Sequence, residues 1–79
     1  MSEVVMYGTT TCSKCKILIM ACEKKNYKVK YVTVDAGDAM FHTLLEHSVK
    51  SFPVLEVDGN FIFSKSLSEF EEIIAANQH

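Results

Sequence analysis

The sequence predicts an α/β fold in which a four-stranded mixed sheet and three helices follow the order β-α-β-α-β-β-α. Strand-like apolar runs alternate along the chain with segments of helical periodicity, and the pair Asp58-Gly59 favours a tight hairpin between the last two strands. A β-α-β unit implies parallel strands with a right-handed crossover, whereas a hairpin adds an antiparallel edge. The 79 residues suffice for one small core, so we expect residues 1–79 to form a single domain.

The first half of the chain is expected to form a β-α-β unit. Residues 3–7 are a short apolar strand, which Gly8 and three threonines end. Residues 13–26 lack glycine and proline and have lysines near their end. Positive charge there suits the negative end of a helix dipole, so this segment is predicted to be a helix. Residues 27–35 alternate apolar and polar side chains, as a half-buried strand does.

A second helix is expected from Asp38, as its N-cap, to about Ser48. Its apolar residues recur at helical spacing, so they should form one buried stripe. That stripe consists of Met40, Phe41, Leu44, Leu45 and Val49.

The last part of the chain is expected to form a hairpin and a helix. The two strands are residues 53–57 and 60–63, and the helix runs through Ala76. A serine followed three residues later by a glutamate can form a capping box at the start of that helix. The sequence offers this pattern twice, as Ser66 with Glu69 and as Ser68 with Glu71.

Composition limits the partners and the compartment. A net charge of −2 gives no electrostatic reason to bind nucleic acid or an anionic membrane. No apolar run approaches the roughly 20 residues of a membrane helix, and no signal peptide is visible. Three cysteines are too few for a disulfide-stapled secreted scaffold, so we expect a cytoplasmic protein, and we expect it to be a monomer.

Cys12 and Cys15 are the strongest chemical feature. They follow an apolar strand and open a helix, where unpaired backbone N–H groups and the helix dipole favour a thiolate. Cys15, almost one turn further on, is close enough to attack a mixed disulfide on Cys12. The arrangement predicts a site of thiol–disulfide exchange. A structural or metal-ligating role for Cys12 is the alternative, although a zinc site needs two further ligands at compatible spacing.

Cys22 lies two helical turns after Cys15 on the same face, beside Leu18. A free cysteine in such a place commonly behaves as a small buried hydrophobe, so we expect Cys22 to pack in the core.

The chain resembles the glutaredoxins, a family with the thioredoxin-like fold, over nearly its whole length. The resemblance rests on the strand before Cys12-Ser13-Lys14-Cys15, on Phe52-Pro53 opening the third strand, on Asp58-Gly59 and on the capped last helix. It is similar to the compact glutaredoxins and glutaredoxin-like redoxins of bacteria and phages. Ser13 stands where the family often has proline.

The resemblance implies a thiol–disulfide oxidoreductase that serves electron transport and cell redox homeostasis. Cys12 would attack the client disulfide and Cys15 would resolve the intermediate, or Cys15 would stay unreactive if exchange ran through Cys12 alone. Glutathione is the implied reducing co-substrate, with thioredoxin reductase as the alternative donor and ribonucleotide reductase as a frequent client. No metal or other cofactor is required. An iron–sulfur cluster module and a non-catalytic partner-binding module are the alternatives from other classes.

Two substrate-binding features are expected beside the cysteines. Lys14 would stabilise the Cys12 thiolate and attract a carboxylate of glutathione, or it is a solvated helix-start residue. The resemblance implies that Pro53 is a cis-proline. It also implies that the backbone of Phe52, the residue before it, pairs with the bound thiol substrate. The alternative is an ordinary proline at a strand start.

The segment before the last helix departs from the family. Glutathione-binding members have paired glycines there, whereas residues 63–69 contain none. Lys65 and the helix-start N–H groups near Ser66 would still hold a carboxylate. Alternatively, Ser66 is only a helix cap, and the pair Phe63-Ser64 resembles the redoxins that thioredoxin reductase reduces.

Overall fold

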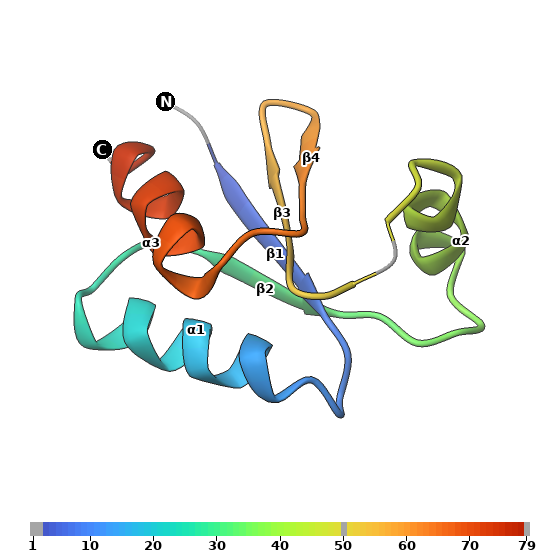
Figure 1. Ribbon diagram of the computed structural model, residues 1–79, viewed down its shortest axis with the longest axis horizontal. Coiled ribbons are helices and arrows are strands. Elements are labelled where there is room, and N and C mark those ends of the chain that lie inside the picture. The colour runs from blue at the N-terminus through green and yellow to red at the C-terminus, as the bar shows by residue number, and fades with distance from the viewer. Residues whose placement is uncertain (1–2, 50, 79) are drawn as a thin grey trace.

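The structure, a computed structural model, describes residues 3–49 and 51–78 and confirms the predicted order of elements (Figure 1). Four strands and three helices make up this part of the chain. In order they are β1 (Val4–Gly8), α1 (Ser13–Lys24), β2 (Lys30–Thr33), α2 (Ala39–Glu46), β3 (Val54–Val57), β4 (Asn60–Ile62) and α3 (Leu67–Ala76). Within the described residues no helix has the length and apolar character needed to cross a membrane.

The sheet is mixed, with the strand order β2-β1-β3-β4. β1 pairs in parallel with β2 and antiparallel with β3, and β3 pairs antiparallel with β4. Gly8 faces Thr33 and Tyr7 faces Val54 in the register. The ends of β1 and β2 therefore lie at the same edge of the sheet as the start of β3, and the segments that follow or precede them meet there.

Helices cover both faces of the sheet. α1 and α3 bury Leu18, Cys22, Phe70 and Ile74 against Val4, Met6, Leu55 and Val57 on one face. On the other face, Leu44 of α2 and Val49 beyond it lie in a cluster with Tyr7, Val34 and Val54. In Figure 1, α1 and α3 lie on one side of the sheet and α2 on the other. Alternate residues of each strand thus serve two separate clusters.

The first two helices end earlier than the sequence patterns predict. α1 stops at Lys24 because Asn26 adopts a left-handed φ of 57°. Tyr27 N–H then donates to Cys22 O at 2.9 Å, which completes a Schellman motif. α2 ends in the same way at Glu46, where Ser48 has a φ of 64°.

β2 and β4 are also shorter than expected. Residues 27–35 alternate as a strand does, but only Lys30–Thr33 are strand, because they lie opposite the last four residues of β1. β4 ends at Ile62, which pairs with Leu55, so Phe63 falls outside the strand. Strand ends here are set by the length of the partner, which local sequence does not reveal.

Two predictions about α2 are wrong in detail. Asp38 is at the N-cap position, but its side chain makes no capping hydrogen bond and accepts instead from Asp35 N–H at 2.8 Å. Leu45, expected in the buried stripe, is 51% exposed. Leu44, the residue before it, is buried, and the rotation of about 100° between consecutive helical residues turns Leu45 toward solvent.

The turn and the last cap follow the sequence closely. Asp58 and Gly59 have φ values of 51° and 81°, as expected for the two central residues of a type I′ hairpin turn. Of the two possible capping boxes, the structure contains the one between Ser66 and Glu69. Both are local patterns that the sequence reveals, although the sequence alone does not decide between the two capping boxes.

Cys22 packs in the core as predicted. It is 1% exposed, and burial is the largest cause of the raised pKa of its thiol, followed by the nearby Glu71. A thiol held neutral and out of solvent is a poor nucleophile. Cys22 is therefore a structural residue, separate from the chemistry of the other two cysteines.

We expect Cys22→Ser to lower the free energy of unfolding by about 1–3 kcal/mol, because it buries a hydroxyl among apolar side chains. Cys22→Ala removes the same sulfur without adding a polar group and should cost less. Urea denaturation of the oxidised proteins measures both values. Equal stability of the Ser and Ala variants would contradict the apolar setting of Cys22.

Candidate active site

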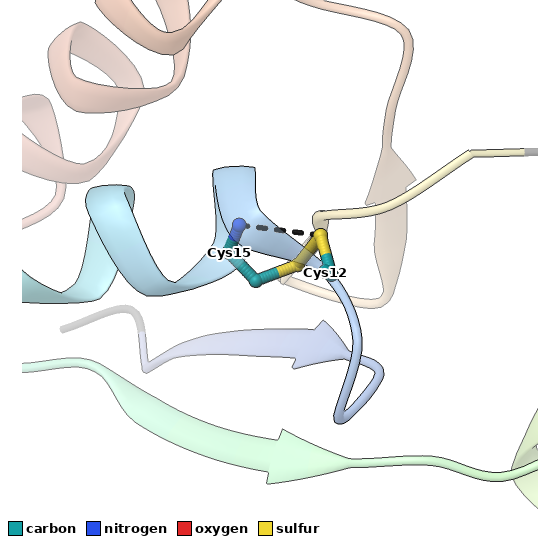
Figure 2. Close-up of a disulfide and its surroundings, with 2 residues drawn as sticks. All are labelled: Cys12 and Cys15. Carbon is teal, nitrogen blue, oxygen red and sulfur yellow. Dashed lines mark hydrogen bonds between the residues drawn. A yellow bond between two sulfur atoms is a disulfide. The ribbon is translucent and has the colours of Figure 1, made fainter.

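Cys12 and Cys15 form a disulfide at the start of α1 (Figure 2). Their Cα atoms are 5.3 Å apart. Cys12 is the N-cap residue and is half-buried, whereas Cys15 has no exposed surface. An incoming thiol can therefore approach the pair only from the side of Cys12.

The start of the helix favours negative charge on Cys12. Its Sγ atom accepts a hydrogen bond from Cys15 N–H at 3.2 Å, in the way that an oxygen-bearing side chain caps a helix. After reduction, the same N–H group and the helix dipole would stabilise a negative charge on Cys12 Sγ. The loop is fixed by a further bond from Cys12 N–H to Thr9 O at 3.2 Å.

Gly8 allows α1 to approach β1 at the buried cysteine. A Cβ atom on Gly8 would lie 2.8 Å from Cys15 Sγ and 3.0 Å from Cys15 Cβ, which is closer than atoms of this kind approach. The hydroxyl of Tyr31, on β2, would lie 2.6 Å from the same point. The absence of a side chain at Gly8 thus makes room for both the sulfur and the phenol.

The Phe52-Pro53 bond is cis, as predicted. Pro53 is buried and directly precedes Val54, which pairs with Tyr7, so it lies at the same end of the sheet as the cysteine loop. The Phe52 ring stacks on Phe41, with centroids 6.2 Å apart and planes at 28°. The ring therefore belongs to the cluster on the α2 face, and the Phe52 backbone directly precedes the cis bond at the end of the sheet that carries the cysteine loop.

The other predicted substrate-binding residues are exposed at helix starts. Lys14 lies between the two cysteines, and Lys65 lies just before α3. Ser66 is the N-cap of α3: its hydroxyl accepts from Glu69 N–H at 3.2 Å, and its own N–H donates to the Glu69 carboxylate at 3.1 Å. Among the described residues no hydrogen bond or ion pair joins these three to the cysteine pair.

The capping box changes the charge at the start of α3. Hydrogen bonds from Ser66 hold the pKa of Glu69 below its usual value, so this carboxylate stays ionised. A second carboxylate arriving at the same helix end would meet a like charge, and it would find the N–H groups of Ser66 and Glu69 already occupied. The capping pattern predicted the contact between Glu69 and Ser66, and the structure adds that this contact places a negative charge at the start of α3.

Tyr7, the residue before Gly8, is a core residue. It is 6% exposed, and its hydroxyl donates to Glu56 at 2.6 Å. Burial and this carboxylate raise the pKa of Tyr7 to about 12, so the phenol stays protonated at neutral pH. Across residues 3–49 and 51–78, no three side chains of His, Cys, Asp or Glu are grouped to hold a metal ion.

A cysteine pair at the first turn of a helix, beside a cis-proline at one end of a mixed four-stranded sheet, defines the thioredoxin-fold thiol–disulfide oxidoreductases. Residues 4–62 match the family model described as Glutaredoxin, which is more than half of the chain. The chain therefore belongs to the glutaredoxin family, and it is a thiol–disulfide oxidoreductase with a Cys12–Cys15 pair.

The comparison with solved structures agrees on the fold. The crystal structure of Plasmodium falciparum thioredoxin is similar with a TM-score of 0.57 and 18% sequence identity, over 98% of this chain and 71% of that one. A search of curated protein sequences gives no match.

We expect Gly8→Ala to lower the free energy of unfolding by about 1–3 kcal/mol, because the added methyl group overlaps Cys15. Gly37→Ala is the matched control, since a Cβ atom there meets nothing within 4 Å. Urea denaturation of the two oxidised variants measures the difference. A Gly8→Ala protein as stable as the Gly37→Ala protein would mean that α1 and β1 are not in close contact at this point.

Proposed function

We propose that this oxidoreductase reduces disulfides in client proteins and glutathione mixed disulfides, and that glutathione returns it to the dithiol form. The observation that carries the proposal is the hydrogen bond at 3.2 Å from Cys15 N–H to Cys12 Sγ. This bond favours Cys12 Sγ as the sulfur that carries the negative charge. Cys15 Sγ, bonded to it in the disulfide form, is then the resolving sulfur.

The reaction divides between the two cysteines. The Cys12 thiolate attacks one sulfur of the client disulfide, and the other client sulfur leaves as a thiolate that takes a proton from water. Cys15 then loses its proton, attacks Cys12 Sγ and releases the second client sulfur. The client gains two electrons and two protons, and the protein holds the Cys12–Cys15 disulfide. Two glutathione molecules reverse this oxidation and become glutathione disulfide.

The backbone beside Pro53 is the proposed docking edge for the client. Phe52 carries its ring toward Phe41, which leaves its main chain to pair with an extended substrate segment as an added strand does. Lys14, exposed beside Cys12, would attract a carboxylate of glutathione or of the client. We propose ribonucleotide reductase as one client and the reducing cytoplasm as the compartment.

Thioredoxin reductase is a second candidate donor, and a specific observation favours it. Lys65 and the start of α3 are the proposed place for a glutathione carboxylate, yet the Glu69 carboxylate already accepts the N–H of Ser66. Repulsion between the two carboxylates would weaken glutathione binding there, whereas a protein donor does not depend on that helix end.

We expect Cys12→Ser to abolish exchange, because it removes the attacking thiolate. Cys15→Ser should keep turnover on glutathione mixed disulfides, which need only Cys12, and lose turnover on protein disulfides. Reduction of each substrate is measured with glutathione, glutathione reductase and NADPH, and in parallel with thioredoxin reductase and NADPH. Full activity of Cys12→Ser would overturn the mechanism, and the assay that supports wild-type turnover identifies the donor.

We expect Glu69→Gln to lower the KM for glutathione by about two- to fivefold, because it removes a negative charge from the start of α3 while the amide still accepts from Ser66. Glu72→Gln, an exposed change on the same helix away from Ser66, is the control. The measurement is the glutathione dependence of the coupled assay. An equal KM for both variants would show that glutathione does not approach this helix end.

A further inference from the structure

Reduction of the Cys12–Cys15 disulfide places a negative charge on a sulfur atom that has no contact with solvent. When a donor thiolate attacks Cys12 Sγ, the electron pair of the broken bond stays on Cys15 Sγ. Cys15 has no exposed surface, and a thiolate in such surroundings is destabilised by loss of water. The reaction therefore needs a group that stabilises the leaving sulfur from within the protein.

Tyr31 is the polar side chain placed to do so. A Cβ atom placed on Gly8 would lie 2.6 Å from the Tyr31 hydroxyl oxygen and 2.8 Å from Cys15 Sγ. The hydroxyl and the sulfur are therefore close neighbours on either side of that position. Tyr31 belongs to β2 and packs against the core cluster formed by α1 and α3. Its ring thus lies on the face of the sheet that carries the cysteines.

The hydroxyl of Tyr31 also has a proton to offer. It donates no hydrogen bond to any described group in the disulfide form, in which Cys15 sulfur is neutral and a weak acceptor. By contrast, Tyr7 uses its hydroxyl on Glu56 at 2.6 Å on the opposite face. Tyr31 is half-buried, so part of its side chain is in contact with solvent.

We propose that Tyr31 is a further catalytic residue of the exchange reaction, whose hydroxyl donates a hydrogen bond to Cys15 Sγ as the disulfide opens. The bond from the donor sulfur to Cys12 forms, the Cys12–Cys15 bond breaks, and Cys15 leaves as a thiolate that accepts the Tyr31 O–H. A proton from solvent then neutralises Cys15, and Tyr31 keeps its own. The same contact stabilises the Cys15 thiolate when it attacks Cys12 in the opposite direction.

This inference rests on exchange at Cys12 and Cys15, and it predicts a kinetic effect without an equilibrium effect. The disulfide and the neutral thiol gain little from a hydrogen-bond donor, whereas the transition state with charge on Cys15 gains much. Removing the hydroxyl should therefore slow reduction and reoxidation by the same factor. A hydroxyl needed only for packing would change stability and the redox equilibrium instead.

The test compares Tyr31→Phe with Tyr27→Phe, which removes a hydroxyl from the other tyrosine packed against the same cluster. Dithiothreitol reduces each oxidised protein, and the rate is followed by acid quenching, alkylation and mass spectrometry. We expect Tyr31→Phe to react about tenfold more slowly than wild type, with Tyr27→Phe unchanged. The equilibrium constant with dithiothreitol and the melting temperature should match wild type in both variants.

Two results would overturn the proposal. One is a Tyr31→Phe rate equal to that of Tyr27→Phe. The other is a slower Tyr31→Phe accompanied by a shifted redox equilibrium or a lower melting temperature, which would assign the hydroxyl to folding. Failure of wild-type protein to be reduced through Cys12 at all would instead remove the exchange function itself, so the two failures are distinguishable.

Discussion

The close contact between Gly8 at the end of β1 and Cys15 in the first turn of α1 fixes the geometry of the whole site. β1 is paired on both sides, so its position is set by the sheet. The contact therefore fixes where α1 begins relative to β1, because Gly8 has no side chain to separate the strand from Cys15 Sγ. Cys12, one turn earlier, is then held at the helix start and at the edge of the protein, where a client can reach it.

The two faces of the sheet have different tasks. One face carries α1, α3, the cysteines and Tyr31, and its packing determines what surrounds the sulfur atoms. The other carries α2 and an aromatic group that includes Phe41, Phe52 and Phe61. Packing within this cluster fixes the ring of Phe52, and the fixed ring orients the main chain next to Pro53. The backbone proposed as the docking edge is therefore positioned by packing on one face of the sheet, and the cysteine pair by packing on the other.

Local patterns gave most of the fold and part of the site. The element order, the Asp58-Gly59 turn and the cap at Ser66 each depend on residues within a few positions of one another, and the structure contains all of them. The extents of β2 and β4 depend on their partners, and the exposure of Leu45 depends on how a short helix lies on the sheet. Those features could not be read from spacing.

The parts of the site that sequence analysis missed are long-range. Tyr31 is one of several alternating strand residues, and nothing near it in the chain distinguishes its hydroxyl from that of Tyr27. Gly8 was recognised as a strand end, but its contact with Cys15 exists only because the helix folds back along the strand. The charge of Glu69 is a different case: the capping pattern predicts its hydrogen bonds with Ser66 and says nothing of the negative charge that it adds to the start of α3.

The difference in exposure between the three cysteines has a consequence for oxidative stress. Peroxide would meet the half-buried Cys12 first and convert its thiolate to a sulfenic acid. Cys15, whose Cα lies 5.3 Å from that of Cys12, would condense with it and expel water, which restores the ordinary disulfide before further oxidation occurs. Cys22 is shielded and takes no part. An encounter with peroxide would therefore end in a form that the normal electron donor can repair.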